Sequence, residues 1–257
     1  MPAYFLQALQ HYPLSPLQWA LAMLAAIILG ISKAGIGSIS MLTVTMLAYT
    51  FGSKTSTGVL LPMLIVADVF AVAFFKRHTQ WRHLLRMVPW MCAGVLLGAW
   101  LGQDLDEALF KKIMAGIVLL SVVVIFWREY KAVNDVPTHW SFAGIMGLGA
   151  GFTTMVGNLA GGFSNVYFLS MRLPKNQFIG TAAWLFFIVN TFKLPFHIFG
   201  WKTVNLHSLA INLILLPFLI GGFFLGLRLV RVIAEDRYRQ LILWLTAASV
   251  VVILLDL

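Results

Sequence analysis

Charged residues are scarce in this chain of 257 residues, and acidic residues are scarcer than basic ones. Only 11% of the residues are charged, and Asp and Glu together number nine, whereas a soluble domain carries about a quarter charged residues. Hydrophobic residues make up 60% of the chain. This composition excludes a water-soluble globule and a disordered chain. It predicts a polytopic membrane protein, which we expect to be all-α.

Other absences exclude further classes of protein. Cys92 is the single cysteine, which excludes a disulfide scaffold. No Lys or Arg precedes Lys33, so the chain lacks the positive segment that opens a cleavable signal peptide. No His, Cys and carboxylate cluster has the spacing of metal ligands, and no P-loop motif is present, so we expect neither a metal nor another cofactor.

The net charge of +9 does not indicate a nucleic-acid partner. The basic residues are scattered over short gaps between apolar runs, which is typical of the inner loops of membrane proteins. We therefore expect the partners to be the lipid bilayer and a small anionic substrate, with no nucleic acid. A second copy of the chain, forming a homodimer, is left open by the sequence.

The apolar runs differ in length. They occupy residues 17–31, 39–51, 59–75, 87–101, 113–127, 142–156, 163–171, 178–199, 206–227 and 241–255. A crossing helix needs about 20 residues, and the runs 39–51 and 163–171 are too short. Each follows another short run across a break rich in Gly and small polar residues, at 30–40 and 151–162. Two half-length helices joined at such a break indicate a re-entrant hairpin or a broken helix.

The pattern repeats along the chain. The pair Gly94 and Gly98 recurs as Gly222 and Gly226, 128 residues later, and Gly30 in the first break corresponds to Gly151 in the second. We predict two repeats, 1–135 and 136–257, each a broken or re-entrant helical hairpin followed by three transmembrane helices. The pairs of glycines would let neighbouring helices pack closely.

The distribution of basic residues indicates that the repeats are inverted. With both chain ends outside, most Lys and Arg residues fall on the inner side, as the positive-inside rule requires. The exceptions outside the membrane core are Lys54, Lys111, Lys112 and Lys202. Parallel repeats would divide the basic residues almost evenly between the two sides.

Three ionisable residues lie at membrane depth, where a charge is costly unless it faces a partner or water. These are Lys33, Lys193 and Asp68. Two cations against one anion predict a site for an anionic ligand. Asp68 is either a proton-coupling residue or the counter-ion of one of the lysines, and the sequence favours neither. Asn190, 122 residues after Asp68, is expected at the matching depth and would donate a neutral hydrogen bond.

The two breaks supply further candidate ligands. Glycine lets the backbone approach a ligand, and a helix that begins at the break presents free N–H groups and a positive dipole end. Opposed helix ends of this kind hold anions in inverted-repeat transporters. The substrate-binding candidates in the breaks are Ser32, Gly37, Ser38, Thr153, Thr154, Gly157, Asn158 and Gly161. The alternative is that the glycines only permit close packing.

At these residues the chain resembles the sulfite exporter TauE/SafE family, also called the toluene-sulfonate uptake permease superfamily. The likeness is closest in the second half, in the G-x5-G-x3-GG pattern at 151–162, the Leu-Pro-Lys turn at 173–175 and Asn190-x2-Lys193. The resemblance implies transport of sulfite, an organosulfonate or a related sulfur anion across the bacterial inner membrane. Both termini would then be periplasmic.

The sequence leaves three classes of function open. The first is a secondary transporter for a small oxyanion, with the two lysines and both breaks holding the substrate and Asp68 available for proton coupling. The second is a passive anion channel with the same polar lining. The third is an intramembrane enzyme acting on a lipid-linked phosphate. A single buried carboxylate argues against the third, because such chemistry needs a supported nucleophile or base, so we expect no enzymatic activity.

Overall fold

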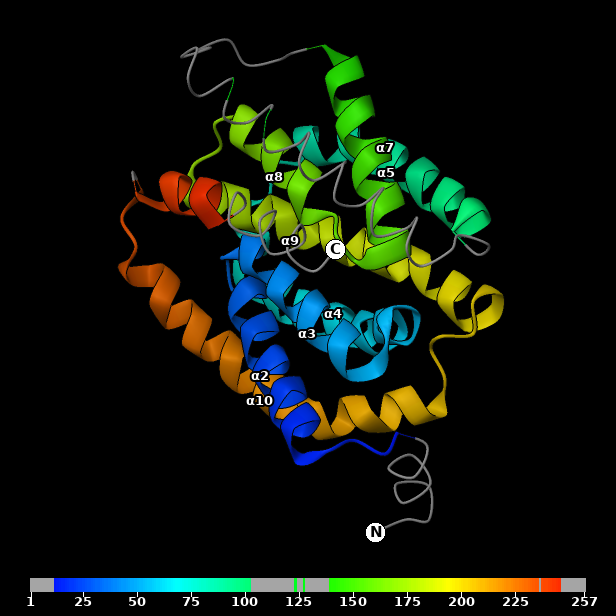
Figure 1. The fold of residues 1–257 in the computed structure, drawn as a ribbon. Helices are drawn as coiled ribbons and strands as arrows, with labels where there is room; N and C mark the ends of the chain where they lie inside the picture. The colour runs from blue at the N-terminus through cyan, green and yellow to red at the C-terminus, as the bar shows by residue number, and fades with distance from the viewer. Residues whose placement is uncertain (1–11, 103–122, 124–126, 128–138, 236, 246–257) are drawn as a thin grey trace.

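The computed structural model describes residues 12–102, 123, 127, 139–235 and 237–245, and the regular structure in these residues is helical throughout (Figure 1). Its elements are α2 (Pro16–Lys33), η1 (Gly37–Ile39), α3 (Ser40–Phe51), α4 (Ser53–Phe75), η2 (Lys76–His78), α5 (Trp81–Leu101), α7 (Trp140–Gly157), α8 (Gly161–Ser170), α9 (Lys175–Pro195), the π-turn η3 (Phe196–Gly200) and α10 (Leu206–Val232).

Five segments in the described part of the chain are long and apolar enough to cross a membrane. They are Pro16–Lys33, Ser53–His78, Trp81–Leu101, Lys175–Gly200 and Leu206–Val232. The prediction of an all-α polytopic membrane protein is confirmed. Most of the predicted spans 113–127 and 241–255 lies outside the described residues.

Both predicted breaks are present, and local residues explain where the helices end. α2 begins with a capping box between Ser15 and Gln18 and ends just before Gly35, whose φ of 137° suits glycine. α7 ends at Asn158, which adopts the left-handed conformation with φ of 58°. The helices that follow are short, with 12 residues in α3 and 10 in α8. Each break therefore joins a longer helix to one of half length.

Glycines fix how the two halves pack against each other. α2 packs against α10, and α5 packs against α7. A Cβ on Gly222 would overlap the Ile27 carbonyl of α2, and a Cβ on Gly94 would overlap the Leu148 carbonyl of α7. The predicted packing role of the glycine pairs is confirmed. Each broken hairpin thus packs on a helix from the other half of the chain, while the inverted relation of the halves stays a prediction.

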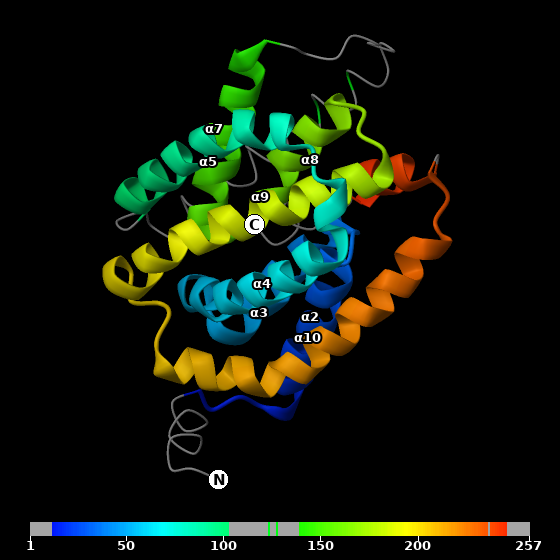
Figure 2. The ribbon, with the colours of Figure 1, turned by 180° about the vertical axis from the view of Figure 1, so that it is seen from behind.

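The helices α4 and α9 cross the middle of the molecule in opposite directions. Gly58 at the start of α4 lies against Thr203 after α9, and Gly180 near the start of α9 lies against Phe75 at the end of α4. Figures 1 and 2 show this central pair between α2 and α10 on one side and α5 and α7 on the other. Residues on α4 and α9 can therefore face both breaks.

Candidate anion-binding site

A small cavity lies where the two breaks meet the central helices. Its volume is about 50 Å³, which is room for a few water molecules or one small anion. The residues of the first break that line the cavity are Ser32, Lys33, Gly35, Gly37 and Ser40. Those of the second break and the start of α8 are Thr154, Asn158, Ala160, Gly161 and Asn165. The central helices contribute Asp68, Asn190 and apolar side chains, among them Ala71, Phe178, Ile179 and Phe186. The structure thus brings eight of the twelve predicted site residues to one cavity: Ser32, Lys33, Gly37, Asp68, Thr154, Asn158, Gly161 and Asn190.

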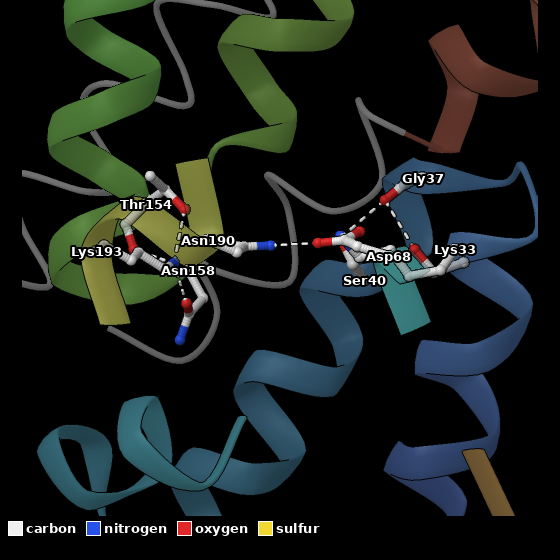
Figure 3. Close-up of polar contacts among 9 residues, drawn as sticks. Lys33, Gly37, Ser40, Asp68, Thr154, Asn158, Asn190 and Lys193 are labelled. Carbon is white, nitrogen blue, oxygen red and sulfur yellow. Dashed lines mark hydrogen bonds and ion pairs between the residues drawn. The ribbon is translucent and has the colours of Figure 1, made fainter. Parts of the chain in front are cut away.

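One polar cluster in the cavity is centred on Asp68 of α4 (Figure 3). Lys33 donates to one carboxylate oxygen at 2.6 Å, and the Asn190 amide donates to the other at 2.6 Å. The Lys33 ammonium also lies 4.5 Å from the centre of the Phe186 ring, a cation–π distance. Asp68 is completely buried, so its charge is stabilised by these two donors. The sequence left open whether Lys33 or Lys193 is the counter-ion of Asp68, and in the structure Asp68 pairs with Lys33.

A second polar cluster is centred on Lys193 of α9, which is also completely buried. Its ammonium donates to the Thr154 carbonyl and hydroxyl oxygens, both at 2.9 Å, and to the Asn158 Oδ1 at 2.5 Å (Figure 3). These oxygens lie at the C-terminal end of α7, where the helix dipole favours a cation. All three ammonium protons therefore have acceptors. Lys193 does not line the cavity itself and reaches it through Thr154 and Asn158.

The two clusters together contain two lysines and one carboxylate. In the part of the chain that the structure describes, Lys33 and Asp68 form a salt bridge, and no carboxylate lies within ion-pair distance of Lys193. A buried cation that has hydrogen-bond acceptors and no counter-ion favours the binding of an anion nearby. The predicted site for an anionic ligand thus has a physical basis in these contacts.

The hydroxyl groups of Ser32 and Ser40 form hydrogen bonds within the first break. Ser32 and Ser40 both donate to the Gly37 carbonyl oxygen, at 3.2 and 2.8 Å. Their protons are therefore not free for a ligand, although both residues line the cavity. In this geometry Ser32 and Gly37 shape the site.

Apart from Lys193, three predicted ligands lie outside the cavity lining. The Ser38 hydroxyl donates to the Ile242 carbonyl at 3.2 Å and accepts from Asn165 at 3.0 Å. The Thr153 hydroxyl contacts the Gly149 carbonyl of its own helix at 2.9 Å. Gly157 is the buried last residue of α7. The contacts of Ser38 and Thr153 join the backbone around each break and so maintain its shape.

Two groups of the second break are placed to donate to a ligand. The Thr154 hydroxyl accepts from Lys193, so its own proton must point to another acceptor, and Thr154 lines the cavity. No side chain caps the N-terminus of α8, and a Cβ on Gly161 would meet no atom within 4 Å. Gly161, the first residue of α8, lines the cavity, and the first N–H groups of a helix lie at the positive end of its dipole.

Sequence reasoning missed three polar residues of the lining, Ser40, Asn165 and Tyr238. Asn165 interrupts the short apolar run 163–171, and a polar amide at that depth was a usable signal. Tyr238 donates to the Gly35 carbonyl at 2.6 Å. This contact joins residues that are distant in the sequence, and no local sequence pattern predicts it.

The fold defines a polytopic membrane protein with a cavity lined by polar side chains at its two helical breaks. A family model described as sulfite exporter TauE/SafE matches residues 22–253, and the chain belongs to this family. The resemblance read from the sequence is confirmed, and membership places the chain among membrane transporters of sulfur anions. No curated protein and no solved structure matches the chain.

Proposed function

We propose that this chain is a secondary transporter that binds sulfite, or an organosulfonate of similar head group, in the cavity between the two breaks. The supporting observation is the buried positive charge of Lys193, which has acceptors but no carboxylate partner in the described part of the chain. A sulfur oxyanion supplies the missing negative charge. The membrane in question would be the bacterial inner membrane, as the family resemblance implies.

The donors around the cavity suit an oxyanion with several equivalent oxygens. Lys33 supplies a charged donor, Thr154 a hydroxyl, and the start of α8 its backbone N–H groups. Hydrogen bonds to a charged group contribute about 1.5–3 kcal/mol each. Three such donors converging from separate elements would hold the sulfur oxyanion and leave an organic substituent free to extend along the apolar lining, such as Phe178 and Phe186.

Proton coupling follows from the salt bridge of Asp68. While Asp68 is ionised, it occupies the Lys33 ammonium at 2.6 Å. When Asp68 takes up a proton, that ion pair is lost and the full charge of Lys33 becomes available to the anion. Asn190 can still donate to the carbonyl oxygen of the protonated acid. Proton and anion would therefore bind together, and net movement would follow their combined gradients.

The test is sulfite flux into proteoliposomes with and without an imposed pH gradient. We expect saturable flux that an acidic exterior accelerates. The double variant Lys33→Gln with Asp68→Asn removes both charges of the salt bridge and retains groups that can hydrogen-bond, so we expect it to fold and to lose the effect of the gradient. Lys76→Gln is the matched control, because Lys76 is exposed and lies outside the cavity. Absence of flux for sulfite and for organosulfonates would overturn the proposal.

The alternative of a passive anion channel makes a different prediction in the same experiment. Channel flux would rise in proportion to sulfite concentration and would not respond to the pH gradient beyond its effect on sulfite ionisation. The family match supports the transporter. The same family match supports a role without catalysis.

A further inference from the structure

A second and larger cavity lies at the basic end of the central helices. Its volume is about 350 Å³, and it is bounded by the end of α4, the start of α9 and the end of α10. The polar side chains that line it are His78, Lys175, Asn176 and Arg231. His78, Asn176 and Arg231 are exposed. This end of the molecule is the one that the positive-inside rule predicts to be cytoplasmic.

The charges at this cavity favour an anion. Lys175 donates through its ammonium to the Val230 and Ile233 carbonyls, at 3.3 and 2.7 Å, which fixes its charge at the cavity wall. Among the described residues, Glu235 is a neighbouring acid, and one of its oxygens accepts from the Lys175 backbone N–H at 2.5 Å. Glu235 does not line the cavity, whereas Arg231 does. A concave surface with basic side chains raises the local concentration of anions.

A thin apolar wall separates this cavity from the anion site. Gly35 and Ile179 line the inner cavity, and Val230 lines the outer one. A Cβ on Gly35 would lie 2.8 Å from the Ile179 Cδ1 and 3.2 Å from the Val230 Cγ2, so the side chains of Ile179 and Val230 both lie beside Gly35. All three are buried. The wall between the two cavities is therefore a single layer of residues at this point.

We propose that the outer cavity is the vestibule through which a small oxyanion reaches the inner site from the predicted cytoplasmic side, and that Gly35, Ile179 and Val230 form the gate between them. This inference rests on the proposed transport of a sulfur oxyanion. The phosphate of an anionic lipid head group carries the same chemistry as a dissolved oxyanion, so the experiment must separate the two sources.

The first experiment compares Arg231→Gln with Arg228→Gln in proteoliposomes. Both arginines are exposed on α10, and Arg231 alone of the two lines the cavity. We expect Arg231→Gln to raise the KM for sulfite entering from this side roughly threefold to tenfold at low salt, with kcat unchanged and the difference lost at high salt. Arg228→Gln should match the wild type. Equal KM values for the two variants, with normal wild-type flux, would overturn the vestibule and leave the proposed function intact.

The second experiment separates a dissolved anion from a lipid. If the cavity holds a lipid head group, the effect of Arg231→Gln will appear in vesicles containing phosphatidylglycerol and vanish in pure phosphatidylcholine, and the vestibule is refuted. If it admits dissolved anions, the effect will be the same in both.

A cysteine probe tests access to the vestibule directly. In a Cys92→Ser background, Asn176→Cys should react with the anionic sulfonate reagent MTSES, and the reaction should block flux. Gln240→Cys, at an exposed position outside the cavity lining, should react without blocking. Undiminished flux after complete modification of Asn176→Cys would overturn the proposal.

Discussion

The substitution Lys193→Met tests the central claim about the buried positive charge. Methionine keeps most of the length and volume of the lysine stem, but it removes the ammonium and its three hydrogen bonds to Thr154 and Asn158. The Asn158 Oδ1 and the Thr154 hydroxyl lose this donor, whereas the Thr154 carbonyl still accepts from the Asn158 backbone N–H at 3.0 Å. At about 1–3 kcal/mol for each of the two unsatisfied buried groups, and with partial relaxation, we expect the free energy of unfolding to fall by roughly 2–4 kcal/mol. Because the packing is preserved, the variant should still fold.

The effect of Lys193→Met on anion binding is separate from its effect on folding. Lys193 reaches the cavity through the Thr154 hydroxyl, which places its charge roughly 7 Å from a bound anion. At an effective dielectric constant of about 20, a pair of unit charges at that distance interacts by about 2.4 kcal/mol. Loss of this interaction corresponds to a weakening of about 60-fold in affinity. Thr154→Val, which keeps the ammonium and removes only one donor, should weaken binding by about tenfold.

The assay is calorimetric titration of the purified protein in detergent with sulfite, after size-exclusion chromatography and a thermal scan establish that each variant is folded. The order of affinities expected is wild type, then Thr154→Val, then Lys193→Met. A folded Lys193→Met protein with wild-type affinity would refute the reasoning, because the anion would then not sense the buried charge. A variant that does not fold is replaced by Lys193→Gln, which removes the charge and retains an amide that can donate to the Thr154 and Asn158 oxygens.

Further substitutions test the other parts of the argument. Asp68→Asn should abolish the part of the pH dependence of sulfite affinity that exceeds the effect of sulfite ionisation. In the wild type this part should strengthen the affinity by up to tenfold for each unit that pH falls, because the bound state takes up a proton; an unchanged pH dependence in titrations would make Asp68 purely structural. Gly35→Ala should slow flux severalfold, because it places a Cβ against the Ile179 Cδ1 at a φ of 137°. Adding Ile179→Val, which lacks the Cδ1 atom, should restore part of the rate. Absence of this rescue would argue against contact at the gate. Gly222→Leu should lower the thermal unfolding temperature strongly, whereas Gly221→Leu, where a Cβ meets nothing within 4 Å, should not; equal shifts would show that close approach of α2 and α10 is unimportant.

The helical breaks could be predicted because they are local features. Runs 39–51 and 163–171 are too short to cross a bilayer, and each lies beside glycines and small polar residues. The structure places α3 and α8 there, beginning at Ser40 and Gly161. The presence of ionisable groups at depth was equally visible, because a charge inside an apolar run is rare.

The sequence could not predict which polar residues of the breaks are available to a ligand and which form hydrogen bonds within the protein. Ser32 and Thr154 are both hydroxyl residues near the end of a helix, yet Ser32 donates to the Gly37 carbonyl while Thr154 accepts from Lys193. Which hydroxyl keeps a proton for a ligand depends on which acceptors lie within about 3 Å. The sequence lists the groups at each break and does not fix those distances.

The sequence also could not predict which of the three ionisable side chains at membrane depth pair with each other. Asp68 is at the depth of either lysine, but α4 and α9 cross so that Asp68 meets Lys33 and Asn190, while Lys193 turns to the end of α7. Had Asp68 paired with Lys193, the uncompensated cation would be Lys33, whose side chain is 9% exposed in the cavity. The observed pairing instead leaves the uncompensated cation completely buried behind Thr154 and Asn158. Water cannot screen a charge in that position, so its attraction for an anion in the cavity is retained.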